Sequence, residues 1–147
     1  MADLKLLALD DEDLAVIAAH LQDAVLRVGD MAYMRADRRF AVVVNRFDWD
    51  HAVRSDGKAQ RYIRRQTGVR IEHVLGAKVS GIDLTDKERV LSLLTLTFEP
   101  GEAPHGAVTL TFAGGGAVRL DVECLEAALN DLGAAWSTRR KPEHAGD

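Results

Sequence analysis

Residues 106–136 read GAVTLTFAGGGAVRLDVECLEAALNDLGAAW, and this stretch decides the fold that we expect for the whole chain. Apolar and polar side chains alternate over 108–112 and again over 118–122, which is the period of a β-strand with one buried face. Three glycines at 114–116 separate the two runs. Because no Lys-Ser or Lys-Thr follows them, they favour the turn of a β-hairpin over a phosphate-binding loop.

The residues after this hairpin have a different period, which predicts a helix over 125–132. Apolar side chains recur there at i, i+3, i+4 and i+7, namely at Leu125, Ala128, Leu129 and Leu132. Asp131 and Gly133 would close this helix, since glycine readily adopts the left-handed conformation of a helix cap. An isolated hairpin is marginal in water, so we expect the helix to cover its apolar face.

The remaining elements predict an α+β fold dominated by antiparallel strands. A helix is expected over 11–26, because the acidic run 10–13 suits a helix N-terminus, and a polar loop is expected over 50–60. Further strands are predicted over 4–9, 31–36, 39–47, 61–66, 69–79 and 90–98. Because helices between successive strands are missing, a curled antiparallel sheet or small barrel is favoured over a parallel sheet. Strands closed by a C-terminal capping helix are analogous to the pleckstrin-homology-like (PH-like) fold.

Length and composition predict a single domain over 1–136, followed by a flexible polar tail over 137–147. Cys124 is the one cysteine, so no internal disulfide forms, which agrees with a reducing compartment. The first residues lack the basic and apolar regions of a signal peptide, and no apolar run is long enough to span a membrane. We therefore expect a cytoplasmic protein without membrane insertion.

The net charge of −4 hides an uneven distribution along the chain. Residues 1–34 carry a net charge of −5, residues 35–78 carry +6, and residues 79–147 carry −5. The middle segment is therefore basic within an acidic protein, which points to an anionic partner or to pairing with the acidic segments.

The first candidate site is the sequence RFDWD at 46–50. Arg46 could hold a phosphate or carboxylate with two hydrogen bonds, Asp48 adds a carboxylate, and Trp49 could stack on a ring. The alternative is structural: Arg46 pairs with an acid, Phe47 packs inward, and Trp49 lies at the rim of the sheet.

The second candidate site is the basic cluster, which comprises Arg54, Lys58, Arg61, Arg64 and Arg65, with Tyr62 among them. Basic side chains next to an aromatic ring are typical of surfaces that bind an anion or single-stranded RNA. Against this interpretation, the whole chain is acidic and carries no RNA-recognition motif of the common kinds. The alternative is that these side chains are solvated or pair with the acids of the other segments, within one chain or between two.

Enzymatic and metal chemistry receive little support from the sequence. The five histidines are scattered, and none has the spacing of a zinc site. Cys124 would lie near the start of the final helix, where the dipole could lower its pKa, yet no neighbouring base is apparent. We therefore assign no catalytic residue, no metal ligand and no cofactor.

Three stretches carry a resemblance to a known family: RRFAVVVNRFDWD at 38–50, FAGGG at 112–116 and VRLDVECLEAALNDLGAAW at 118–136. The chain resembles a family of small bacterial proteins, typical of alphaproteobacteria, that is described only as a domain of unknown function. The resemblance covers most of the chain and implies a cytoplasmic bacterial protein. It implies no activity and no site residues.

These observations favour a non-enzymatic binding or adaptor module that uses the face formed by 46–65 for a protein or anionic partner. The residues expected to contact the ligand are Arg46, Asp48, Trp49, Arg61, Arg64 and Arg65. One alternative is a small enzyme with a site around Arg46, Asp48 and His51. An RNA-binding protein and a homodimer in which acidic and basic segments meet are also compatible with the sequence.

Overall fold

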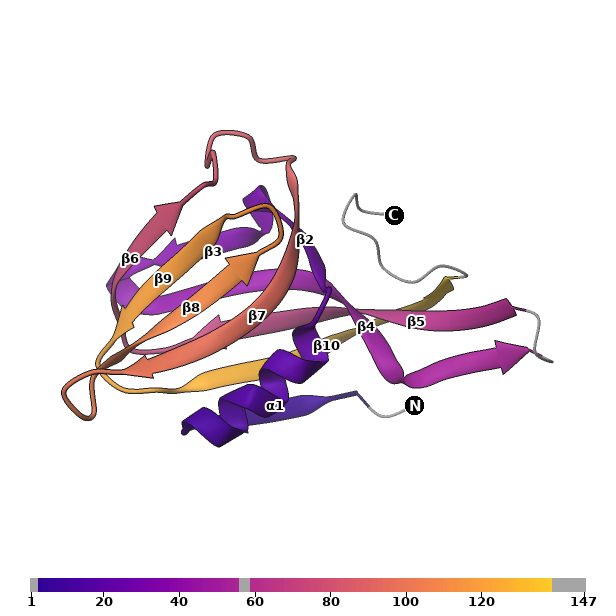
Figure 1. The fold of residues 1–147 in the computed structure, drawn as a ribbon, viewed down its shortest axis with the longest axis horizontal. Helices are drawn as coiled ribbons and strands as arrows, with labels where there is room; N and C mark the ends of the chain where they lie inside the picture. The colour runs from indigo at the N-terminus through magenta and orange to yellow at the C-terminus, as the bar shows by residue number, and fades with distance from the viewer. Residues whose placement is uncertain (1–2, 56–58, 139–147) are drawn as a thin grey trace.

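The computed structural model describes residues 3–55 and 59–138, which form one curled antiparallel sheet and one α-helix (Figure 1). Two single 3₁₀ turns, η1 (Val28–Asp30) and η2 (Arg35–Asp37), and the helix α1 (Asp11–Leu21) interrupt the strands. The strands are β1 (Lys5–Ala8), β2 (Val25–Arg27), β3 (Met31–Met34), β4 (Arg39–Ser55), β5 (Ala59–Ile71), β6 (Val74–Ser80), β7 (Val90–Pro100), β8 (Gly106–Phe112), β9 (Ala117–Val122) and β10 (Ala127–Thr138).

The sheet follows one path, and that path is open. Its strand order is β1-β10-β5-β4-β2-β7-β8-β9-β6, and β3 pairs with β4 beside the path. Every ladder is antiparallel. The α+β class and the curled antiparallel sheet are therefore confirmed, whereas the small closed barrel is wrong, because the end strands β1 and β6 do not pair with each other in the described part of the chain.

The hairpin at the centre of the sequence argument is confirmed. Strand β8 pairs with β9 in a register that places Leu110 opposite Val118 and Val108 opposite Leu120, and all four side chains are buried. Gly114 and Gly115 occupy the turn with φ values of +89° and +98°, a conformation that favours glycine. The period of two thus placed these side chains on the correct face of the sheet.

The C-terminal capping helix predicted over 125–132 is wrong, because residues 127–132 belong to strand β10 and residues 125–126 lie just before it. Strand β10 lies between β1 and β5 and forms a ladder with each of them. A strand with two neighbours and a buried environment has a nearly continuous apolar sequence, and over a short run that sequence also fits a helical stripe. The PH-like analogy depended on a C-terminal helix, so it loses its main support.

The early helix is present but shorter than predicted. The side chain of Asp10 accepts a hydrogen bond from the Asp13 N–H at 2.8 Å, so the acidic run caps the helix as expected. Helix α1 buries Leu14, Ile17 and Leu21 against the core and ends at Leu21, not at residue 26. Within the described residues, no helix is long and apolar enough to cross a membrane.

Strands β4 and β5 differ most from the boundaries that the sequence indicated. The loop predicted over 50–60 is wrong for residues 50–55 and 59–60, which extend these two strands. The break predicted at 67–68 is also absent, because β5 continues through Gly68 to Ile71. The predicted strand 69–79 is divided instead at His73, which has a φ of +59°.

The ends of three strands form an arm that extends from the body of the sheet (Figure 1). We define the arm as residues 46–55 of β4, 59–66 of β5 and 135–138 of β10. The C-terminal tail predicted from residue 137 lies almost wholly outside the described residues, since β10 is described to Thr138.

Substituting two leucines of β10 separates the strand from the helix that the sequence suggested. A helical stripe would bury both Leu129 and Leu132, whereas in the strand Leu129 is fully buried and Leu132 is 51% exposed. We expect Leu129→Ala to lower the free energy of unfolding by about 2–5 kcal/mol and Leu132→Ala by less than about 0.5 kcal/mol, as measured by urea denaturation. Equal, large losses for both variants would contradict the strand.

Candidate functional site

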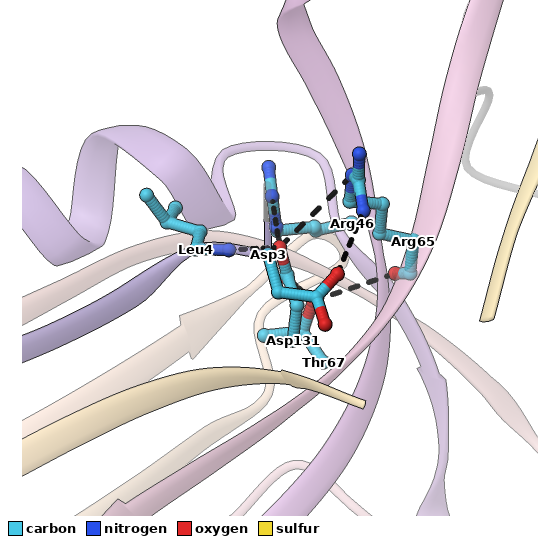
Figure 2. Close-up of polar contacts among 6 residues, drawn as sticks. All are labelled: Asp3, Leu4, Arg46, Arg65, Thr67 and Asp131. Atoms are coloured by element: carbon cyan, nitrogen blue, oxygen red, sulfur yellow. Dashed lines mark hydrogen bonds and ion pairs between the residues drawn. The ribbon is translucent and has the colours of Figure 1, made fainter. Parts of the chain in front are cut away.

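A group of residues joined by hydrogen bonds, most of them buried, lies where the arm joins the body of the sheet (Figure 2). The ladder places Arg46 of β4 opposite Arg65 of β5, and Thr67 of β5 opposite Asp131 of β10. Residues two apart on one strand share a face, so these side chains all point to the inner side of the sheet. We call this group the charged cluster, and its members are Asp3, Leu4, Arg46, Arg65, Thr67 and Asp131.

Asp131 is the centre of the charged cluster. Arg46 donates two hydrogen bonds to its carboxylate, from Nε to Oδ1 at 2.9 Å and from Nη2 to Oδ2 at 2.8 Å. The Thr67 hydroxyl donates to Oδ1 at 2.7 Å, and the backbone N–H of Leu4 donates to Oδ2 at 2.7 Å. The Asp131 side chain is 1% exposed and that of Arg46 is 3% exposed. This is a bidentate, charge-assisted pair whose acceptor oxygens are saturated by protein donors.

A second arginine completes the cluster. The Arg65 side chain is buried, and its Nη1 donates to Oδ1 of Asp3 at 3.3 Å. Its Nε lies 4.0 Å from Oδ2 of Asp131. The cluster therefore contains two buried guanidinium groups, the buried carboxylate of Asp131 and the half-exposed carboxylate of Asp3, and these charges compensate each other.

The environment keeps Asp131 ionised. Burial raises the pKa of Asp131, but hydrogen bonds from Arg46, the Leu4 N–H and Thr67, together with the charge of Arg46, outweigh it and lower this pKa to about 2. A carboxylate of this kind is not a proton donor or acceptor near neutral pH. The cluster is therefore built to hold strands together and not to transfer protons.

The structure places the residues of the two candidate sites in different environments. The guanidinium groups of Arg46, Arg64 and Arg65 are buried, and that of Arg64 lies 4.8 Å from the centre of the Phe47 ring. Arg46 thus pairs with an acid, as its structural interpretation required. The side chains of Asp48, Trp49, His51 and Arg61 lie outside the described residues, although their backbone belongs to β4 and β5.

Two irregular ladders flank the charged cluster. Asp48 of β4 pairs with Ile63 of β5, and Val53 pairs with Arg61. The four residues 49–52 of β4 therefore lie opposite a single residue of β5, Tyr62. In β10, residues 132–134 lie opposite Gln66 of β5, and Gly133 has a φ of +88°. Extra residues in one strand bend it and increase its twist, so these two bulges mark the place where the arm changes direction.

Cys124 and His105 are two further reactive side chains in the described part of the chain. Cys124 lies between β9 and β10, so its predicted place near the start of a helix is wrong. It lines a cavity of about 330 Å³ together with His105, but the described residues contain no hydrogen bond between the two side chains. Among residues 3–55 and 59–138, no group of three or more His, Cys, Asp or Glu side chains could hold a metal ion.

Sequence reasoning missed Asp131 and Thr67. Asp131 was interpreted as a residue that closes a helix, and Thr67 fell in a predicted break between strands. The available signal was the presence of a single acid in the apolar segment 127–136, because an acid at a buried position requires a cationic partner. Such a signal identifies a partner of opposite charge without saying which arginine it is.

Removing either partner of the central ion pair should destabilise the fold strongly. We expect Asp131→Asn and Arg46→Met each to lower the free energy of unfolding by about 3–5 kcal/mol, because one buried charge is left uncompensated. The double variant Arg46→Met with Asp131→Leu should recover most of this loss. Arg119→Met is the control, since the ion pair of Arg119 with Glu99 is exposed, and it should cost less than about 1 kcal/mol. Equal destabilisation in the double and single variants would refute this account.

The depressed pKa of Asp131 also predicts how stability depends on pH. This carboxylate is ionised in the folded state down to about pH 2, whereas its ordinary pKa is 3.8. Its contribution is therefore complete above pH 3.8 and is lost as the pH falls through the folded-state pKa, by on the order of 2 kcal/mol in total. Denaturation between pH 6 and pH 2 should show a steeper loss for the wild type than for the Arg46→Met, Asp131→Leu double variant. Parallel curves would show that Asp131 does not titrate in this way.

Comparison with known proteins identifies the chain by its family. No curated protein and no solved structure matches it significantly. A family model described as a protein of unknown function, DUF2948, matches residues 4–144. The resemblance to an uncharacterised family is thereby confirmed, and this description assigns no activity to the residues discussed above. The chain belongs to the DUF2948 family of proteins of unknown function.

Proposed function

We propose that this chain is a non-enzymatic binding module that contacts a partner protein through the arm. The observation that carries the proposal is the free edge of β4 beyond Asn45. Strand β3 pairs with β4 only over residues 39–42, and β2 pairs with β4 only at Asn45. From residue 46 onward, β5 is the one strand paired with β4 among the described residues. The opposite edge is therefore open to an extended segment of another protein.

The charged cluster supports a role in which the arm keeps a defined orientation. The cluster joins β4, β5, β10 and the N-terminal segment at the base of the arm. A buried ion pair with saturated hydrogen bonds can favour one specific geometry more than it adds net stability. By this hypothesis, the pair of Arg46 and Asp131 fixes the orientation of the arm. A rigid edge binds a partner strand with less loss of conformational entropy than a mobile one.

Burial of the arginines favours a protein partner over a polyanion. Arg64 and Arg65 belong to the basic cluster, yet both are buried and so are not available to a phosphate backbone. The cations of the basic cluster that remain as candidates for an anionic partner are Arg54, Lys58 and Arg61. RNA binding and homodimer formation are therefore alternatives that the experiment below distinguishes.

The small-enzyme alternative loses one of its three residues. The guanidinium of Arg46 is buried and holds Asp131 with two hydrogen bonds, so it cannot also bind a substrate. The bulge at 49–52 is the observation that still favours a ligand near Asp48 and His51, since bulges are frequent beside functional sites. A contact of the bulge with the partner accounts for the same feature. The proposal includes a cytoplasmic location.

The proposal can be tested by affinity capture with proline variants at two sheet edges. Val53→Pro removes a backbone donor from the free part of β4, and Val79→Pro removes one from β6, the last strand of the path that begins with β1. We expect Val53→Pro to abolish recovery of the protein partner and Val79→Pro to retain it, with nuclease treatment having no effect. Thermal denaturation of both variants verifies that they are folded.

A third variant distinguishes the alternatives. The triple substitution Arg54→Glu, Lys58→Glu and Arg61→Glu should leave a protein partner bound by backbone pairing. Loss of the partner in this variant, together with nuclease sensitivity, would identify a nucleic acid and reject the proposal. Retention of the partner by Val53→Pro would reject the edge of β4 as the contact surface. Self-capture that disappears at high salt would identify the homodimer instead.

A further inference from the structure

A shallow apolar groove crosses the outer face of the sheet, on the side opposite the core. Its volume is about 440 Å³, and it spans β3, β4, β5 and β10. The outward positions of these strands form its surface, because Ala41, Val43, Gly68 and Asn130 alternate with core residues. In the ladders, Gly68 lies between Val43 and Asn130, and Ala41 lies opposite Arg70. The groove is thus built by the body of the sheet and is separate from the free edge of the arm.

Gly68 leaves the floor of this groove open. It lies in the interior of β5, where glycine destabilises a strand because it adds conformational freedom and no packing. The ladders with β4 and β10 are regular at this position, and its φ is not in the left-handed region, so neither a bulge nor a turn requires glycine. A Cβ built here would lie 3.6 Å from Cδ2 of Leu132, which is ordinary van der Waals contact. The remaining reason for glycine at this position is the close approach of a ligand to the backbone.

Two arginines give one end of the groove a positive charge. Nε of Arg39 and Nε of Arg70 both donate to the carboxylate of Glu72, at 3.0 Å and 3.1 Å. The two cations thus share the carboxylate of Glu72, and the charge of Asp37 also acts on Arg39. Of these four side chains, the two arginines are the ones that line the groove. The side chains of Arg39 and Arg70 are 43% and 46% exposed, and their Nη nitrogens have no protein partner among the described residues.

The far end of the groove has the opposite character. Asp30 lines the groove there, and its Oδ2 accepts a hydrogen bond from the Arg27 N–H at 3.0 Å. An anionic group is attracted to Arg39 and Arg70 and repelled by Asp30, so the charges define one orientation for a ligand with a single negative end. The volume lies within the range of small-molecule sites, which are mostly apolar with a few polar groups that orient the ligand.

From these observations we propose that the groove binds a small amphipathic carboxylate. Its apolar part lies over Gly68, in contact with Met34, Val43 and Leu132, and its carboxylate accepts hydrogen bonds from the Nη nitrogens of Arg39 and Arg70. No covalent step is involved. Ligand binding in the groove does not depend on partner binding through the arm, so either proposal can fail without the other.

The test measures binding of decanoate to the full chain by NMR titration, with decylammonium and decanol as probes of the same length. We expect saturable shifts for decanoate at residues of β4, β5 and β10 that line the groove, weaker ones for decanol, and none for decylammonium. No saturable shift up to about 5 mM decanoate would overturn the proposal, as would equal binding of decylammonium.

Two glycine variants provide the matched comparison. Gly68→Val fills the groove with a residue that suits a strand, so decanoate affinity should fall at least about tenfold while the melting temperature stays the same or rises. Gly76→Val is the control, because Gly76 lies in β6, where an added Cβ meets no atom within 4 Å, and its affinity should equal that of the wild type. Unchanged decanoate binding in Gly68→Val would overturn the proposal.

A substitution of Arg70 tests whether the arginines at one end of the groove bind the carboxylate. Arg70→Gln should weaken decanoate at least about tenfold and leave decanol unchanged, since only the charge-assisted bond is lost. A parallel loss for both ligands would overturn the assigned role of the arginine.

Light scattering on the wild type and on Gly68→Val tests whether a second copy of the chain occupies the groove instead. A wild-type dimer that becomes monomeric on Gly68→Val would show that a second copy covers this face, and this would overturn the proposal.

Discussion

The buried carboxylate of Asp131 is the constraint on which the arrangement of the arm, the body and the N-terminal segment depends. Its four hydrogen bonds come from β4, β5 and the backbone just before β1, so one side chain connects segments separated by as many as 127 positions in the sequence. Backbone ladders alone permit a strand to slip or bend where a bulge interrupts them. A charge that must be neutralised by Arg46 permits only the register in which both groups meet.

This constraint acts where the sheet is least regular. The bulges in β4 and β10 lie on either side of β5 near the charged cluster, and they would let the arm adopt several directions if nothing else held its base. The cluster replaces the missing ladder bonds with side-chain bonds at buried positions. The core of the body is built differently, from apolar side chains of the strands and of α1. The chain therefore uses packing to stabilise its body and polar geometry to orient its arm.

The sequence predicted those elements whose pattern is local. The alternation in 106–122 and the acidic N-cap of α1 are complete within a few residues, so β8, β9 and the start of the helix were recognised. Strand β10 was not, because its two neighbours β1 and β5 come from distant parts of the sequence, and burial by them removed the alternation. The sequence offered the pairing of Arg46 with an acid as one interpretation, but it did not identify Asp131 as that acid, since 85 residues separate the two partners. Local sequence patterns indicate which face of an element is buried, whereas the topology of the sheet determines which strands and side chains pair with it.

Three residues occupy positions where stability alone would favour a different side chain, namely Arg46, Asp131 and Gly68. Asp131 and Arg46 occupy buried positions where apolar residues of similar size would often stabilise the fold as well or better. Gly68 occupies a strand interior where a side chain would fit and would favour the strand. Selection for folding alone does not explain these choices, and sequences usually depart from local consistency at sites that serve another purpose. The orientation of the arm and the open floor of the outer groove are the two features that these residues maintain, so both features are where the function of the chain is to be sought.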